Sequence, residues 1–287
     1  MKVSVVIPNY KKHPLVDNLS QVLKACPGCE IIVADDASPD DTVKFLKKNF
    51  PRVKVVVNQK NLRFAATCNA GAAAASGDVV VLLNSDVAPK KGFLKPLLTH
   101  FNKDKKVFAV SCLEIQFALG KKSFSGKNRC WFERGFLNHA AAPIVNFKKP
   151  ALNCWGTGGS MALDRKKFMD LSGFDTIYAP AYWEDIDLSW RARQQGFRIL
   201  FEPRSRVFHN HETTNISVFG QKRLSTMAYR NQLIFVWNNI RGRRLVEHFL
   251  WLPYHLTITT LRSQGLFLVA FFWAIWRKLT YRPSEKL

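Results

Sequence analysis

Three groups of polar residues directly follow short apolar runs in the first part of the chain. They are Asn9, Asp35-Asp36 and Asn84-Ser85-Asp86, after apolar runs at 3–7, 30–34 and 79–83. Carboxylate and amide oxygens in such positions can bind nucleotide hydroxyls, base N–H groups or a hard divalent cation. Further along, Glu184-Asp185 begins a predicted helix and could provide a base that accepts a proton.

The elements that would position these residues alternate between strand and helix from the first residue. Predicted strands cover 3–7, 30–34, 53–57 and 79–83, and predicted helices 16–25, 40–50 and 65–76. Runs of β-branched apolar residues are typical of buried parallel strands, and apolar spacing of three and four indicates helices. We therefore predict an α/β fold with a mostly parallel, Rossmann-like sheet flanked by helices. The polar groups should converge at the carboxyl ends of its strands.

The pattern weakens after residue 93. Residues 120–150 mix Lys, Ser, Gly and aromatic residues, and we expect irregular structure there. Order returns with the glycine-rich segment 155–160, a helix near 165–171, a helix from Glu184 to the stop signal Gly196, and a strand at 197–201. We predict one domain over residues 1–220 and a separate tail over 221–287.

Composition limits the classes of partner. The 287 residues are 47% hydrophobic, enough for one large core, and 43 Lys and Arg against 21 acidic residues give a net charge of +22. That excess favours anionic partners, which include nucleotide phosphates, nucleic acid and acidic membrane surfaces. Because the strand-end edge is acidic, we expect no nucleic acid there.

The tail combines basic and apolar residues. Residues 222–286 contain eleven Lys and Arg, opposed by Glu247 and Glu285. The apolar run 266–276 is shorter than the ~20 residues of a spanning helix. Its basic and Trp-rich flanks favour a helix lying on an anionic leaflet, so we predict peripheral membrane contact. The alternative is a helical hairpin packed on the catalytic domain or on a second subunit.

The cysteines give little support for redox or metal chemistry. Among the six, only Cys26 and Cys29 have a suggestive spacing, and they precede a strand instead of opening a helix. We interpret them as a turn. The sequence begins without a signal-peptide pattern, which favours a cytoplasmic address.

The acidic residues suit transfer from a sugar diphosphate. A divalent cation on Asp86 would neutralise the leaving diphosphate, Asp35 and Asp36 would hold base or ribose, and Asp185 would act as base. Each pattern also has a plainer explanation. Asp86 could belong to a helix N-cap or a turn, residues 38–41 after the Asp35-Asp36 pair could cap the next helix, and Glu184-Asp185 could offset a helix dipole. A dinucleotide site is disfavoured because no G-x-G-x-x-G follows the first strand.

Taken in order, eight motifs resemble those of the family-2 glycosyltransferases with a GT-A fold, in particular their rhamnosyltransferase-like branch. The likeness covers about residues 3–215. The motifs lie at 4–10 (SVVIPNY), 33–38 (VADDAS), 61–71 (NLRFAATCNAG), 77–87 (GDVVVLLNSDV), 158–160 (GGS), 172–175 (SGFD), 182–191 (YWEDIDLSWR) and 203–209 (PRSRVFH).

This resemblance implies a role for each matching residue. The donor side would comprise Pro8, Asn9, Tyr10, Asp35, Asp36, Arg63, Asn69 and Ser85. Gly159, Trp183 and Glu184 would form the acceptor side, with Asp185 as catalytic base. Asp86 and His209 would hold Mg²⁺ or Mn²⁺, and His211 could replace His209.

Three positions depart from the family pattern. Asn84 replaces the first acid of a D-x-D motif, which leaves fewer metal ligands, and Ala37 replaces a glycine. Arg63 stands where relatives have glycine, and its guanidinium could pair with a phosphate or be a solvated charge.

The resemblance further implies an inverting, hexosyl-type transfer from a nucleotide-sugar to a glycan or lipid-linked acceptor, in cell-surface polysaccharide synthesis. The C-terminal region is similar to that of relatives acting on polyprenyl-diphosphate-linked glycans, at the inner face of the cell membrane. Other readings are a polyprenyl-phosphate glycosyltransferase, a basic nucleic-acid-binding protein and an inactive GT-A scaffold.

Overall fold

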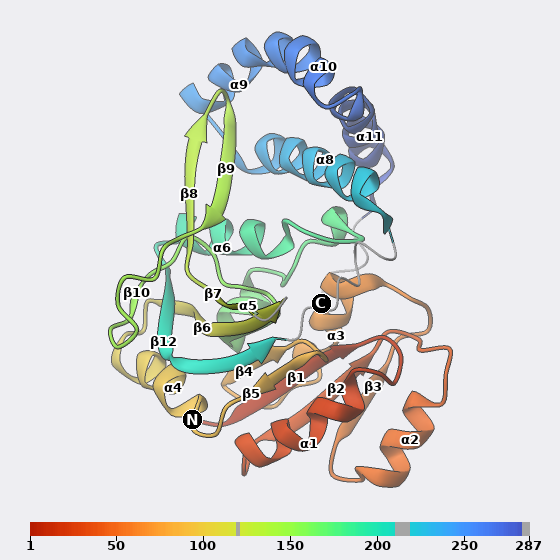
Figure 1. The fold of residues 1–287 in the computed structure, drawn as a ribbon, viewed down its shortest axis with the longest axis vertical. Helices are drawn as coiled ribbons and strands as arrows, with labels where there is room; N and C mark the ends of the chain where they lie inside the picture. Colours follow the sequence, from red (N-terminus) through yellow and green to blue (C-terminus); the bar gives the residue numbers. More distant parts are fainter. Residues whose placement is uncertain (119–120, 210–218, 283–287) are drawn as a thin grey trace.

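The computed structural model describes residues 1–118, 121–209 and 219–282 (Figure 1). Its centre is a ten-stranded mixed sheet of order β10-β12-β6-β11-β4-β1-β2-β3, with β5 paired to β12 and β7 to β6. The strands are β1 Val3–Asn9, β2 Glu30–Asp35, β3 Lys54–Val57, β4 Val79–Leu83, β5 Val87–Pro89, β6 Val107–Ala118, β7 Lys121–Ser125, β10 Ala151–Leu152, β11 Ser160–Asp164 and β12 Arg198–His209.

The first half of the chain has the predicted alternation. β1 pairs in parallel with β2 and β4, and β2 with β3. The connecting helices are α1 Leu15–Ala25, α2 Thr42–Asn49 and α3 Arg63–Ala73. Asn9 lies opposite Asp35 in the register, so these polar strand ends meet at one edge as expected.

The second half of the sheet is mixed. β11 runs antiparallel to both β4 and β6, whereas β12 runs parallel to β6. Because β11 is antiparallel, its first residues lie beside the last residues of β4. Ser160 is the register partner of Leu83, which places the glycine-rich segment before β11 next to Asn84.

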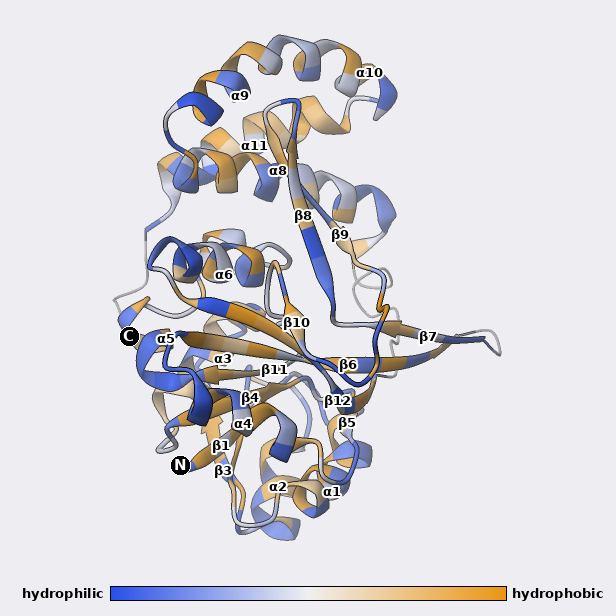
Figure 2. Cartoon of the chain, turned by 90° about the vertical axis from the view of Figure 1, so that its left-hand side faces the viewer, coloured by the Kyte–Doolittle hydropathy of each residue, from blue (hydrophilic) through white to orange (hydrophobic). Residues whose placement is uncertain are grey.

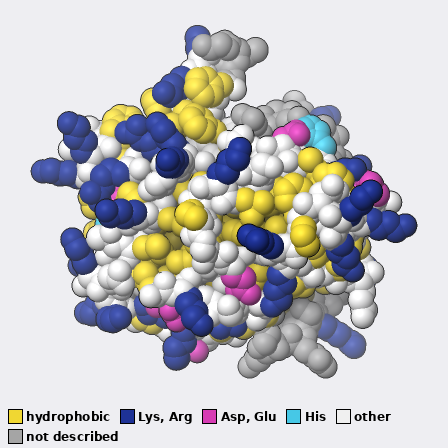
Figure 3. Space-filling model, turned by 90° about the horizontal axis from the view of Figure 1, so that it is seen from below, with side chains coloured by type: hydrophobic (Ala, Val, Ile, Leu, Met, Phe, Trp, Pro, Cys, Tyr) yellow, Lys and Arg dark blue, Asp and Glu magenta, His cyan; other side chains and the backbone are white. Residues whose placement is uncertain are grey.

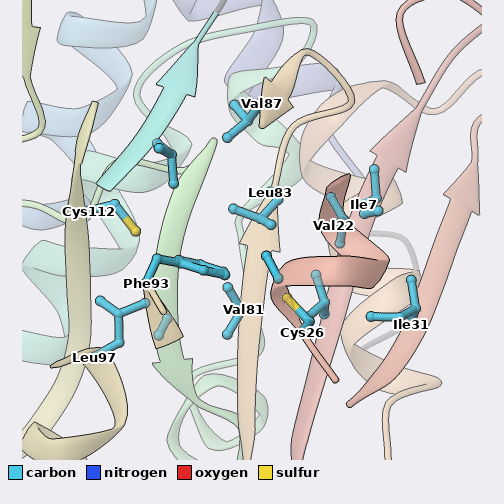
Figure 4. Packing of buried hydrophobic residues seen from close by; sticks show 14 of the residues in the cluster. Ile7, Val22, Cys26, Ile31, Val81, Leu83, Val87, Phe93, Leu97 and Cys112 are labelled. Carbon is cyan, nitrogen blue, oxygen red and sulfur yellow. The ribbon is translucent and has the colours of Figure 1, made fainter. Parts of the chain in front are cut away.

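Helices cover both faces of the sheet because successive strand residues point to opposite sides. Val5 and Ile7 face a cluster completed by α1 and by α4 Leu94–Lys103, where Phe93 and Leu97 are buried (Figure 4). Val6 faces the other cluster, with α3, α5 Arg165–Asp170 and α6 Glu184–Gln194. The core therefore holds the strand ends rigidly beneath the site.

The prediction of irregular structure at 120–150 is wrong. Besides β7, this stretch forms the hairpin of β8 Asn128–Glu133 and β9 Phe136–Ala141. Arg134 and Gly135 both have positive φ, 49° and 74°, as in a two-residue type I′ turn. A Cβ on Gly135 would come 2.5 Å from the His248 Cα, so the turn presses against the C-terminal helices.

The C-terminal helices lie at one end of the molecule (Figures 1 and 2). They are α8 Gln221–Asn239, α9 Arg243–Tyr254, the π-helical η2 His255–Thr259, α10 Thr260–Arg262 and α11 Leu266–Thr280. α8 and α11 share a buried cluster with Tyr178, Trp183 and Ile186. Part of the tail thus packs on the preceding domain, which was the alternative to a free interfacial helix. In the described part of the chain, no helix has the length and apolarity to cross a bilayer.

In each of two cysteine pairs, the two residues lie close to one another. Cys26 and Cys29 form the predicted turn before β2, with the Cys29 amide donating to the Cys26 carbonyl at 3.2 Å. Cys130 of β8 and Cys154 form a disulfide with a Cα–Cα distance of 6.1 Å. The sequence spacing gives no sign of this second pair, which ties the hairpin to the segment before Trp155.

Candidate active site

The segment 158–160, at the start of β11, makes hydrogen bonds to residues from three different elements. The Gly159 carbonyl accepts from the Asn84 amide at 2.9 Å, just beyond β4. The Gly158 amide donates to Asp185 Oδ2 at 3.3 Å, at the start of α6. Ser160 Oγ donates to Glu114 Oε1 at 2.6 Å, on β6. Residues far apart in sequence therefore meet around three consecutive positions.

Asp86, His209 and Glu114 form a charged group on one side of this segment. His209 ends β12, and its register partner Val87 follows Asp86 directly. Asp86 Oδ1 lies 3.3 Å from His209 Nε2, and Glu114 Oε2 lies 3.6 Å from His209 Nδ1. Glu114 was not predicted, although a glutamate within the apolar strand sequence around Leu113 and Ile115 was a signal for it.

The charges in this group stabilise one another. Burial alone would raise the pKa of Glu114, but hydrogen bonds from His209, Ser160 and Ser125 outweigh it and lower the pKa to about 2. Burial would lower the pKa of His209, but Asp86 and Glu114 raise it to about 9. Without a cation, His209 is therefore protonated, and a metal binding to it would displace that proton.

These residues fit a cation that also binds a diphosphate. Within the described residues, the buried Oδ1 of Asn84 accepts no hydrogen bond, and Asp86 Oδ1 has His209 Nε2 as its partner at 3.3 Å. No group of three His, Cys, Asp or Glu side chains there forms a complete metal site. Mg²⁺ commonly takes one or two carboxylates and completes its shell with substrate phosphates and water. Asp86 with His209 suits such partial coordination. His211 lies outside the described residues.

Asp185 and Glu184 lie on the other side of segment 158–160. Asp185 is half-buried, and its Oδ1 accepts from the Ile186 amide at 2.8 Å. Burial raises the pKa of Asp185 to about 6, although hydrogen bonds from the Gly158 and Ile186 amides oppose the change. Burial and the charge of Asp185 raise the pKa of the buried Glu184 to about 8. The pKa values of both carboxyls are thus raised, and Glu184, which is more buried and also faces the charge of Asp185, is the harder of the two to ionise.

The residues before Glu184 adopt an unusual backbone. Tyr182 and Trp183 have φ of 69° and 79°, a left-handed conformation that is unfavourable for bulky side chains. α8 holds this backbone in place. Asn231 Nδ2 lies 2.8–2.9 Å from the carbonyl oxygens of Tyr178, Ala181 and Tyr182.

Arg230 adds to this support from α8. It is fully buried, donates to the Tyr178 and Ala179 carbonyls at 3.1 and 2.7 Å, and stacks over the Trp273 ring. Sequence reasoning missed both Arg230 and Asn231, because they lie in the segment assigned to the tail.

Asp36, predicted on the donor side, holds the loop that leads into α3. Its carboxylate accepts from the Leu62 and Arg63 amides at 2.7 and 2.8 Å and from Asn58 Nδ2 at 2.9 Å. The loop leads into α3, whose Phe64 ring would lie 3.3 Å from a Cβ on Gly158. Asp36, Asn84 and Asp185 are thereby connected through the same segment.

The other predicted donor residues differ in exposure. Tyr10 is exposed and Pro8 is buried, and Asn9 is buried with its Nδ2 3.2 Å from Asp35 Oδ2. Asp35 is fully buried and accepts from the Ser38 amide and hydroxyl, which makes it an anchor of the turn after β2.

Four further predicted residues serve neighbouring structure. Asn69 is buried and exchanges two hydrogen bonds with the Phe174 backbone, at 2.8 and 2.9 Å. The Ser85 carbonyl accepts from Asn18. Arg63 is exposed, with its guanidinium 5.9 Å from the centre of the Phe219 ring. Trp183 is buried against His139 and Phe235.

The family assignment follows from comparison with known proteins. The model of the family described as "Glycosyl transferase family 2" matches residues 4–170, more than half of the chain. The chain belongs to glycosyl transferase family 2. The match contains segment 158–160, Asp36, Asp86 and Glu114, and ends before Asp185 and His209.

Relatives and solved structures of glycosyltransferases agree with this family. The pre-mycofactocin glycosyltransferase of Mycobacterium tuberculosis is 28% identical over 213 residues, which cover 74% of this chain and 43% of the relative. The chain therefore spans less than half the length of that relative.

Two solved structures show the GT-A fold. GalNAc-T7 in complex with UDP, GalNAc and Mn²⁺ has a TM-score of 0.68 at 22% identity, covering 83% of this chain and 48% of that one. S. aureus TarS 1–349 in complex with UDP-GlcNAc has a TM-score of 0.63 at 16% identity, and the match covers 96% of this chain and 81% of the TarS chain. At these identities, the likeness establishes the shared fold.

Gly159 offers a direct test of the site's packing. A Cβ at this position would lie 2.6 Å from Asn84 Nδ2, so Gly159→Ala must push Asn84 aside. Because overpacking costs about 1–3 kcal/mol, we expect the donor Kd to rise about tenfold. Calorimetric titration with a nucleotide-sugar measures it. Adding Gly159→Ala to the Asn84→Ala variant should then change the donor Kd little. If the losses of donor affinity from the two substitutions add fully, Gly159→Ala acts through a contact other than Asn84.

Proposed function

We propose that this chain is an inverting, metal-dependent transferase that moves a sugar from a nucleotide-diphosphate-sugar to a hydroxyl acceptor. One observation carries the proposal. Segment 158–160 joins the acidic group of Asp86 and Glu114 on one side to Asp185 on the other, at the carboxyl end of the parallel strands. A metal-binding carboxylate and a base that flank one position are what displacement at an anomeric carbon requires.

The chain's residues divide the reaction between them. A divalent cation, Mg²⁺ or Mn²⁺, bound by Asp86 and His209 would neutralise the charge that develops on the leaving diphosphate. Asp185 accepts the proton of the acceptor hydroxyl as that oxygen attacks the anomeric carbon. The bond from this carbon to the diphosphate breaks on the opposite face, which inverts its configuration. Glu184, whose pKa is raised by burial and by the charge of Asp185, would donate a hydrogen bond on the acceptor side when it is protonated.

The donor side is formed by the loop that Asp36 holds. Asn9 and Tyr10 border the base in this proposal, and Asp36 both fixes the loop and keeps lone pairs for a ribose hydroxyl or base N–H. Arg63, exposed at the start of α3, would pair with a phosphate in this proposal. GalNAc-T7 and TarS bind UDP or a UDP-sugar in their solved structures, which supports a nucleotide donor here.

The acceptor is proposed to be a glycan or a polyprenyl-linked glycan, as in the rhamnosyltransferase-like branch of cell-surface polysaccharide synthesis. The basic, apolar C-terminal helices support an acceptor presented at the cytoplasmic face of the cell membrane. A polyprenyl phosphate acceptor is the second candidate, favoured by the same helices. Nucleic acid is disfavoured because the site edge carries Asp36, Glu114 and Asp86.

A thermal-shift screen tests donor binding. We expect one class among UDP-, GDP- and dTDP-sugars to raise the Tm in the presence of Mn²⁺, because a ligand that binds only the folded state stabilises it. At a concentration 100 times the Kd, the gain is about 2.7 kcal/mol. If no nucleotide-sugar raises the Tm while Mn²⁺ is present, an inactive scaffold becomes the better description.

A further inference from the structure

We propose that the outward faces of α9, α10 and α11 form a surface that docks on an anionic lipid bilayer. This deepens the proposed function by naming the surface that would meet a membrane-borne acceptor. The surface, here called the outer apolar surface, consists of Val246, Phe249, Leu250, Trp251, Ile258, Leu261, Leu268, Val269, Phe272, Ile275, Trp276 and Leu279.

In α9 the exposed apolar residues follow helical spacing. Val246, Phe249 and Leu250 lie three and four positions apart, so they share one face of the helix. Leu250 is 76% exposed, while His248 on the other face is fully buried against the Gly135 carbonyl. α9 therefore fastens to the hairpin turn through one face and presents an apolar face to the outside.

α11 has the same division. Phe267, Ala270 and Ala274 are buried against α8, whereas the opposite face carries Phe272 at 61% exposure and Leu279 at 81%. The inward face is packed on α8, and the outward face leaves most of Phe272 and Leu279 uncovered by the described part of the chain. Leu261 in α10, 75% exposed, continues the apolar surface between the two helices. Large contiguous apolar patches on a monomer mark interaction sites.

The charges around the surface favour anionic lipid as the occupant. Arg243 and Arg244 begin α9 and Arg262 ends α10, while Arg277 and Lys278, in the last turn of α11, donate inward to the Thr176 and Ile177 carbonyls and to Asn238. In residues 219–282, the single acidic side chain is Glu247. Apolar and aromatic side chains flanked by Arg and Lys are typical of helices at the interface of an anionic membrane.

A second copy of the chain fits this surface less well. In a symmetric dimer the same patch meets itself, so the clustered arginines of one protomer would approach those of the other. Because Glu247 is the single acidic side chain in residues 219–282, this contact is repulsive on balance. A bilayer containing anionic headgroups instead supplies both the apolar interior and the negative charge.

Basic charge alone does not distinguish this surface. Lys and Arg side chains are also scattered over the opposite end of the molecule, where some acidic side chains accompany them (Figure 3). The experiment must therefore separate apolar insertion from general attraction of a protein with a net charge of +22.

Vesicle co-sedimentation makes this separation with charge-matched variants. The test variant is Leu250→Glu with Phe272→Glu, both on the outer apolar surface. The control variant is Val145→Glu with Leu152→Glu, which are 87% and 68% exposed and lie outside the surface. Each variant changes the net charge equally. With phosphatidylcholine vesicles containing phosphatidylglycerol, we expect the test variant to bind at least about tenfold more weakly than the wild type. The control variant should bind like the wild type.

Several outcomes would overturn the proposal. One is no binding of the wild type to the anionic vesicles. Another is equal binding by the test and control variants, which would show that general electrostatic attraction alone accounts for vesicle binding. A third is a wild-type dimer in light scattering that the test variant dissociates, without vesicle binding, which would assign the surface to a second copy. Unchanged thermal unfolding confirms folding of the variants. Because no donor is present, failure here leaves the proposed chemistry untouched, and failure to bind a nucleotide-sugar leaves this result standing.

Discussion

Replacing Asp185 with asparagine should lower kcat by about 10²–10⁴-fold, the usual contribution of a general base, while donor affinity remains close to that of the wild type. The amide cannot accept the proton of an acceptor hydroxyl. Its remaining oxygen can still accept from the Gly158 or Ile186 amide, so the start of α6 should keep its position. Initial rates of nucleotide release give kcat, and titration with the donor gives affinity.

The pH profile identifies the group that titrates. Burial raises the pKa of Asp185 to about 6, and a base must be ionised to act. Wild-type activity should therefore rise as pH increases through about 6, and the rise should be absent in Asp185→Asn. Glu184→Gln is the matched neighbour, and it should lower kcat much less, because the raised pKa of Glu184 favours the neutral form that glutamine resembles. Wild-type turnover by Asp185→Asn would remove Asp185 from the mechanism.

Replacing Asp86 with alanine should weaken donor binding by about 10- to 100-fold in Mn²⁺. This is the loss typical of removing a group that supports a metal ligand, so the loss of a ligand itself should be at least as large. The cause would be loss of the carboxylate that pairs the cation with the diphosphate. Because the effect acts through the cation, the wild type and the variant should bind the donor equally in EDTA. Calorimetric titration in Mn²⁺ and in EDTA measures both conditions.

His209→Ala provides the companion measurement. Since Asp86 and His209 would hold the same cation, the double variant should lose little more than either single variant. A loss of equal size in Mn²⁺ and EDTA would show instead that Asp86 acts on the donor or on folding without a metal.

The sequence could predict the parallel half of the fold because its signals are local. Continuous apolar strands and amphipathic helices alternate there, and polar residues at the strand ends lie side by side by topology alone, as Asn9 and Asp35 do. Prediction of the Glu184-Asp185 helix start succeeded for a similar reason, since acidic residues before an apolar pattern begin helices.

The rest depended on long-range contacts. The hairpin of β8 and β9 was missed because its turn is Arg134-Gly135 instead of Asn-Gly, and its outward residues face solvent. Glu114 has no motif of its own; its role appears when antiparallel β11 brings Ser160 to it. Asn231 could be recognised only once α8 was placed beneath the backbone of Tyr182.

The hydrogen bonds from α8 bear on how this protein can diversify. A chain ending at residue 220 retains every motif of the catalytic domain but lacks the amide and guanidinium that hold the left-handed backbone before Glu184. The tail therefore could not be exchanged between relatives without losing these contacts to the domain before it. If the proposed acceptor side is right, substitutions in α8 would reshape it while each signature residue stays unchanged, so relatives with the same motifs could differ in acceptor.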